Sequence, residues 1–198
     1  MAQLPQQTLF DKAIEFDDKG DIKTAIEFYN KSAEIEQNVI ALFNLGVIYE
    51  SLDDISTAIK FYKLACDKND VDALNNLATI YIIQKEYELA KECLLKSVKV
   101  EHVNLESQYY NLGILYMCMG KFNNMKKWFT KAIAIYKHKP SLKYLFNYYK
   151  KNNNTSEIIN LFNMIDNKSI LTTISINDII DVLKSVKIVT NNENKDEL

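Results

Sequence analysis

Aromatic and small apolar residues recur along this chain with a period of about 34 residues. An aromatic residue is followed nine positions later by a small or apolar residue, and four positions after that by a second large apolar residue. A repeat of this length cannot bury its apolar face alone, so the pattern predicts an array in which each repeat packs against its neighbours. The five triplets are Phe16, Ala25 and Tyr29; Tyr49, Ala58 and Tyr62; Tyr81, Ala90 and Leu94; Tyr116, Met125 and Phe129; and Tyr149, Ile158 and Phe162.

Each repeat contains the apolar spacing of two helices. In the second repeat, Leu42, Leu45 and Tyr49 share one face of a first helix, and Ala58 and Tyr62 share one face of a second. Only four Gly and two Pro are present, too few for the many turns of an all-β fold. The predicted fold is all-α, with an array over residues 6–165 of about five antiparallel helix pairs: 6–38, 39–70, 71–105, 106–138 and 139–165.

The residues Leu42, Leu45, Gly46 and Tyr49, followed by the second-helix pattern A-x-x-x-F-x-x-A in variant form, resemble the tetratricopeptide repeat. The resemblance covers about residues 6–165. It implies a right-handed solenoid that acts as a non-catalytic scaffold for protein binding. Sel1-like repeats have a related motif but a longer loop between helices, whereas all five spacings here are nine residues.

Some positions depart from the family pattern. No proline ends a repeat, Met125 and Ile158 stand where a small second-helix residue is expected, and Phe146 replaces the small first-helix residue of the fifth repeat. The fifth repeat therefore matches the pattern least well.

In the resembled family, regularly spaced first-helix positions line a concave groove. The corresponding residues here are mostly apolar, which suits an amphipathic helix from another protein. A second possibility is that neighbouring second helices or the chain's own C-terminal helix bury this face. The candidate protein-binding residues are Phe10, Ile14, Phe43, Val47, Asn75, Thr79, Ile82, Tyr110, Ile114, Lys143 and Asn147.

Some family members clamp the terminal carboxylate of a chaperone with Lys and Asn on one repeat and Asn on the next. Lys143 and Asn147 have the required spacing, but no following repeat completes the clamp, and the first repeat has Phe10 and Ile14 instead. Binding of a chaperone tail is therefore disfavoured.

Charge is distributed unevenly, although the net charge is only -2. Residues 1–60 hold 11 acidic and 5 basic side chains, while Lys121–Lys151 contains nine lysines and no acid. The alternative function is therefore binding of an acidic partner or nucleic acid through Lys121–Lys151. Lysine runs on helices are ordinarily solvated, so nucleic acid is the less favoured partner; self-association stays open. The aromatic residues among these lysines fit the repeat core better than a base-stacking platform: Trp128, Tyr136, Tyr144, Tyr148 and Tyr149.

The sequence offers no recognisable catalytic, metal or cofactor site, so we do not expect an enzyme. His102 and His138 have no metal-ligand spacing, and glycine-rich phosphate loops are absent. The three cysteines are odd in number and widely spaced, which suits thiols in a reducing compartment. Without a secretory leader or an apolar run long enough to span a bilayer, a cytoplasmic protein is expected. The final Lys195–Leu198 spells an endoplasmic-reticulum retrieval signal, which we interpret as coincidence.

A C-terminal linker and capping helix are expected over residues 166–189. Ser175 and Asp178 have the capping-box spacing, and an amphipathic pattern continues to about Lys187. This helix either caps the fifth repeat or occupies the groove. Residues 190–198 are polar and charged, which predicts a disordered tail.

Overall fold

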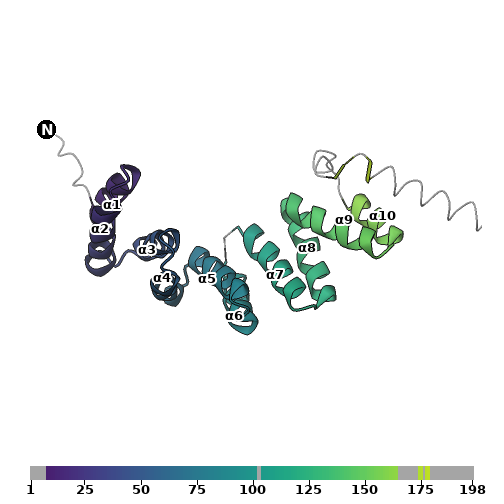
Figure 1. Ribbon diagram of the computed structural model, residues 1–198, viewed down its shortest axis with the longest axis horizontal. Helices are drawn as coiled ribbons and strands as arrows, with labels where there is room; N and C mark the ends of the chain where they lie inside the picture. Colours follow the sequence, from purple (N-terminus) through teal and green to yellow (C-terminus); the bar gives the residue numbers. More distant parts are fainter. Residues whose placement is uncertain (1–7, 102–103, 165–173, 176, 179–198) are drawn as a thin grey trace, which may run out of the picture. The chain divides into compact units, whose positions relative to one another are not determined.

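The computed structural model describes residues 8–101, 104–164, 174–175 and 177–178, and these contain ten α-helices (Figure 1). Within these described residues there is no strand, so the prediction of an all-α array of helix pairs is confirmed. The five pairs are α1 (Leu9–Asp18) with α2 (Ile22–Ile35), α3 (Val39–Ser51) with α4 (Ile55–Asp67), α5 (Val71–Ile83) with α6 (Tyr87–Ser97), α7 (Glu106–Cys118) with α8 (Phe122–Tyr136), and α9 (Lys139–Lys151) with α10 (Thr155–Asn163).

The chain divides into two compact units, residues 1–103 and residues 104–198. Unit 1 contains α1 to α6, and unit 2 contains α7 to α10. Within each unit, every helix packs against the next one along the chain. Except for Ser175, Asn177 and Asp178, the predicted capping helix and polar tail lie outside the described residues.

The same short turn joins the two helices of every pair. Its first part is a residue with left-handed backbone, and the next residue is the N-cap of the second helix. In α2 and α4 the N-cap is an aspartate, Asp21 or Asp54, whose carboxylate accepts a backbone hydrogen bond from the third helical residue. This constant turn is why the triplet spacing is nine residues in all five repeats. The left-handed residues are Gly20, Asp53, Lys85, Gly120 and Asn153.

Small first-helix residues let second-helix rings pack directly on the backbone. A Cβ atom on Gly46 would lie 2.5 Å from the Tyr62 ring, and one on Gly113 would lie 2.2 Å from the Phe129 ring. Tyr62 and Phe129 are both completely buried. The conformational freedom of glycine is not used at Gly46 and Gly113; what matters is the absence of a side chain.

Tyrosine hydroxyls link pairs within unit 1. The Tyr62 hydroxyl donates to Glu50 Oε2 at 2.7 Å and accepts from Asn76 Nδ2 at 3.2 Å, so it joins the second pair to α5. Burial and the hydrogen bond to Glu50 raise the pKa of Tyr62. The Tyr29 hydroxyl donates to Asp17 within the first pair at 3.2 Å, and burial raises the pKa of Tyr29 to about 12. Both hydroxyls therefore stay protonated at neutral pH and keep these links.

Candidate protein-binding face

All eleven predicted groove residues lie on the first helix of a pair, and each reaches the surface at least in part. Seven lie on α1, α3 and α5 in unit 1, and four lie on α7 and α9 in unit 2. Their helical neighbours at the intervening positions, such as Ala13, Leu45 and Leu112, are completely buried. The periodicity therefore separates core positions from surface positions on these helices.

In unit 1 the candidate face is apolar and carries no charge among its predicted residues. Val47 is 40% exposed, and Ile14 is similarly open. Phe10 and Phe43 are less exposed, because their rings pack against those of Tyr29 and Tyr62, with centroid distances of 5.8 and 5.9 Å, respectively. Val47 is thus a cleaner binding candidate than Phe43, which also supports the core.

In unit 2 the candidate face is aromatic and basic. The Tyr110 ring lies 4.8 Å from the His138 ring and 6.2 Å from the Tyr144 ring, centroid to centroid. Tyr144 also stacks on Phe129 at 5.6 Å, yet it is 40% exposed. Tyr144 therefore contacts the repeat core, as its spacing predicts, and also reaches the surface. Its helical position, one residue after Lys143, was the available signal for a place on this face.

A cavity of about 350 Å³ lies on the exposed side of α9. Two predicted residues line it, and the sequence analysis missed the other two. The basic side chain in its wall and the absence of acidic residues from α9 favour anionic or neutral groups over cations. Among the described residues, those that line the cavity are Pro140, Lys143, Tyr144 and Asn147.

The basic stretch Lys121–Lys151 is divided between two helices. On α8, the Lys131 ammonium lies 4.8 Å from the Trp128 ring centroid and 5.5 Å from that of Tyr109. Such cation–π contacts engage a lysine with its own unit. On α9, Lys143 and Lys151 are exposed, and Lys143 lines the cavity. The α9 lysines are therefore better placed for an acidic partner than Lys131.

The capping of α9 involves a titratable group. The backbone amide of Ser141 donates to His138 Nδ1 at 3.2 Å, so this nitrogen is the unprotonated one. Burial lowers the pKa of His138, an effect that Glu106 partly opposes. The imidazole is consequently neutral at pH 7.

A second cavity, of about 260 Å³ in unit 1, contains two thiols that do not resemble catalytic groups. Burial raises the pKa of Cys66 to about 12 and that of Cys93 to about 11. Thiols in this state are poor nucleophiles. Among the described residues, no cluster of three or more His, Cys, Asp or Glu side chains could hold a metal ion. No described helix has both the length and the apolar content needed to cross a bilayer.

The chain is similar in fold to several solved structures. The chain matches the crystal structure of MamA protein at 22% identity and a TM-score of 0.65, over 83% of this chain and 89% of that one. It matches pilF of Pseudomonas aeruginosa at 18% identity and a TM-score of 0.69, over 90% of this chain and 83% of that one. It matches MamA 41-end from Desulfovibrio magneticus RS-1 at 16% identity and a TM-score of 0.63, over 78% of this chain and 89% of that one. At these identities the likeness concerns the fold.

Two sequence profiles described as tetratricopeptide repeat match the chain. One matches residues 7–39, 39–67 and 109–139, and the other matches residues 64–92. No curated protein matches the sequence. Stacked repeats of this kind present extended surfaces for other proteins, which supports a role as an interaction scaffold. With matches in four of the five helix pairs and the same fold in solved structures, the chain belongs to the tetratricopeptide repeat family.

Proposed function

We propose that this chain is a non-catalytic scaffold that binds another protein or peptide through the exposed faces of its first helices. The observation that carries the proposal is the surface position of all eleven candidate residues beside a buried core. Apolar side chains gathered on a surface usually mark an interaction site. The face on unit 1 is the main candidate, because its predicted residues are uncharged and mostly apolar.

The chemistry of the unit 1 face suits an amphipathic helix. Phe10, Ile14, Phe43 and Val47 offer aliphatic and aromatic contacts, and Asn75 and Thr79 add polar groups. An apolar helix face that docks on such residues is a common recognition mode. Affinity would then depend on a few exposed apolar side chains rather than on charge.

A charge placed at Val47 tests this proposal. Val47→Glu should weaken partner binding at least about tenfold, which corresponds to about 1.4 kcal/mol. The matched control is Leu64→Glu, since Leu64 is 49% exposed but lies on the second helix α4. Affinity purification from the native cell, followed by calorimetry with the partner identified, compares the two variants. Equal binding by Val47→Glu and wild type would refute the proposal.

A second candidate function is binding of an acidic partner by the lysines of α9. It is favoured by the exposed Lys143 and Lys151 on a helix without acidic residues. Affinity for a polyglutamate peptide should fall steeply between about 50 and 200 mM salt. Lys143→Gln should weaken binding more than Lys127→Gln, whose lysine lies on α8. Stronger binding of a single-stranded RNA would instead favour nucleic acid, and sedimentation equilibrium would reveal self-association.

A further inference from the structure

Two pairs of stacked rings follow one another along the contact between α8 and α9. Phe129 of α8 stacks on Tyr144 of α9, and Phe122 stacks on Tyr148 with ring centroids 5.4 Å apart. The two phenylalanines are seven residues apart and the two tyrosines four, so each two share one face of their helix. Each stack has one ring open to solvent, since Tyr144 is 40% exposed and Phe122 is 45% exposed. The contact between α8 and α9 therefore presents two accessible aromatic rings.

A third cavity, of about 440 Å³, lies beside the stack of Phe122 on Tyr148. Both rings line it, and the turn before α8 and the first turn of α8 supply an ammonium group and two side-chain amides. Amides of this kind can donate to and accept from the edges of unpaired bases. Glu106 and Glu157 are the acids of residues 104–164, and neither lines this cavity. Among the described residues, those that line it are Gly120, Lys121, Phe122, Asn123, Asn124 and Tyr148.

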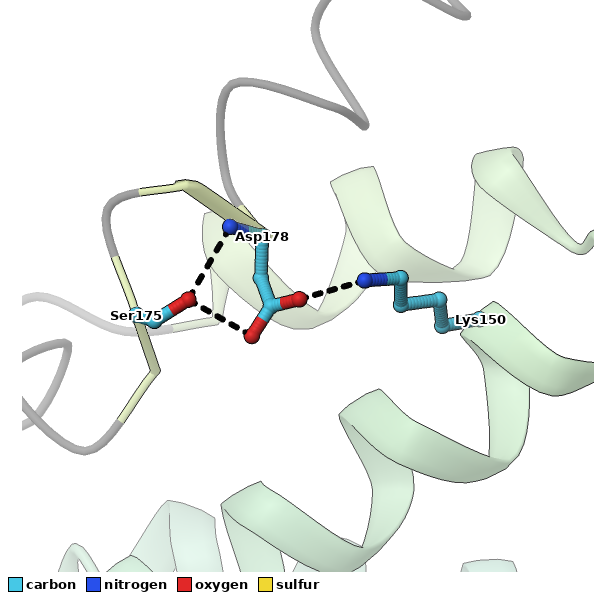
Figure 2. Close-up of polar contacts among 3 residues, drawn as sticks. All are labelled: Lys150, Ser175 and Asp178. Carbon is cyan, nitrogen blue, oxygen red and sulfur yellow. Dashed lines mark hydrogen bonds and ion pairs between the residues drawn. The ribbon is translucent and has the colours of Figure 1, made fainter.

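Unit 2 carries a large positive charge, and the last turn of α9 shows how part of it is balanced. Residues 104–164 contain nine lysines and only two acids. Figure 2 shows Lys150 Nζ donating to one carboxylate oxygen of Asp178. The Ser175 hydroxyl donates to the other oxygen at 2.7 Å, so each oxygen of this carboxylate accepts a hydrogen bond. The charge of Lys150 is therefore compensated within the chain.

Three exposed lysines lie closer to the accessible rings. Lys151 follows Tyr148 by three residues, so the two side chains share one face of α9. Lys121 and Lys143 each line one of the two cavities that contain an accessible ring. Aromatic rings beside lysines are the chemistry that binds single-stranded nucleic acid, because bases stack on the rings while ammonium groups meet the phosphates. An acidic peptide would use the lysines but not the rings.

We propose that unit 2 binds single-stranded nucleic acid along the contact between α8 and α9. Bases stack on Phe122 and Tyr144, and phosphates contact Lys121, Lys143 and Lys151. Lysines alone did not favour nucleic acid over another acidic partner, whereas accessible rings beside them do. This site does not depend on the partner of unit 1, so a charge placed on the unit 1 face should leave nucleic-acid affinity unchanged.

Fluorescence anisotropy with a labelled oligouridylate of about ten nucleotides tests the rings in the full chain. Phe122→Leu keeps an apolar side chain but removes the aromatic face, so it should weaken binding at least about fivefold. Ile135 is 58% exposed on the same helix, and the control Ile135→Ala should bind like wild type. Equal affinity of Phe122→Leu and wild type for the oligouridylate would overturn the proposal.

Comparison of ligands separates the possible partners. A duplex RNA of the same length should bind more weakly than the oligouridylate, because its bases are already stacked and paired. Affinity for a polyglutamate peptide should be the same in Phe122→Leu and wild type. Tighter binding of oligothymidylate than of oligouridylate would identify the strand as DNA. Tighter binding of the duplex or of polyglutamate than of both single strands would overturn the proposal.

Salt dependence tests the lysines separately. If three lysines each contact a phosphate, affinity should fall about twentyfold between about 50 and 200 mM salt. Lys151→Gln removes one contact, so the fall should shrink to about sevenfold. Lys131→Gln changes the net charge equally, but the Lys131 ammonium lies 4.8 Å from the Trp128 ring centroid, and the full fall should remain. The same fall in both variants would overturn the placement of phosphates at Lys151. Circular dichroism confirms that each variant is folded.

Discussion

Replacing Gly46 with alanine tests the packing on which the second helix pair depends. The new Cβ atom would lie 2.5 Å from Cδ1 and Cε1 of Tyr62. The ring has little freedom to move, because it is completely buried and its hydroxyl is held by Glu50 and Asn76. The clash must therefore be relieved by separation of α3 from α4.

Two effects of opposite sign set the magnitude. Overpacking of a well-packed core costs about 1–3 kcal/mol. Alanine in a helix interior is better than glycine by about 1 kcal/mol. Because the contact involves two ring atoms of a buried side chain, we expect a cost at the upper end of its range. The net loss in the free energy of unfolding should be about 1–2 kcal/mol.

Urea unfolding, followed by far-ultraviolet circular dichroism, measures this loss. The sharper experiment repeats Gly46→Ala in a Tyr62→Leu background, which has the combination found in the third repeat, where Ala78 and Leu94 hold the corresponding positions. With the ring removed, Gly46→Ala should be neutral or stabilise by up to about 1 kcal/mol. Equal effects of Gly46→Ala in both backgrounds would refute the packing argument.

Three further predictions concern single side chains. As the pH falls below 6.5, the free energy of unfolding should decrease, because the unfolded chain protonates His138 more readily than the folded chain does. In urea titrations, the variant His138→Asn, which keeps an N-cap, should lack this decrease. Gln108→Leu should raise the free energy of unfolding by about 1 kcal/mol, since Gln108 Oε1 is buried without a hydrogen-bond partner in the described part of the chain; a loss would contradict this. Mass spectrometry should show maleimide on exposed Cys118 long before buried Cys66, and the reverse order would be unexpected.

The helix pairs were predictable because both of their determinants are local. The apolar period marks the buried face of each helix, and the turn inside each pair needs only one left-handed residue and one N-cap. Asp53 fills the left-handed position in the second pair as Gly20 does in the first. Asparagine and aspartate tolerate this backbone, so the turn does not need glycine everywhere.

The candidate face was only partly predictable. Helical spacing placed Val47 and Lys143 at the surface, but it could not tell how far an aromatic side chain extends beyond the core. Tyr144 stacks on Phe129 with one part of its ring and remains exposed with the other. The contact between Lys150 and Asp178 joins residues 28 positions apart, beyond the reach of any local pattern.

The two units connect their helix pairs by different chemistry. In unit 1, the Tyr62 hydroxyl joins α4 to Asn76 of α5, and desolvation keeps that hydroxyl protonated. In unit 2, the equivalent position is Phe129, which has no hydroxyl, and α8 meets α9 through the stack of Phe129 on Tyr144. A hydrogen bond can be satisfied inside the core, whereas a stack on a surface helix leaves one ring partly in solvent. Unit 2 therefore has an exposed aromatic group beside Lys143 for a structural reason, and the same ring that connects its pairs is available to a ligand.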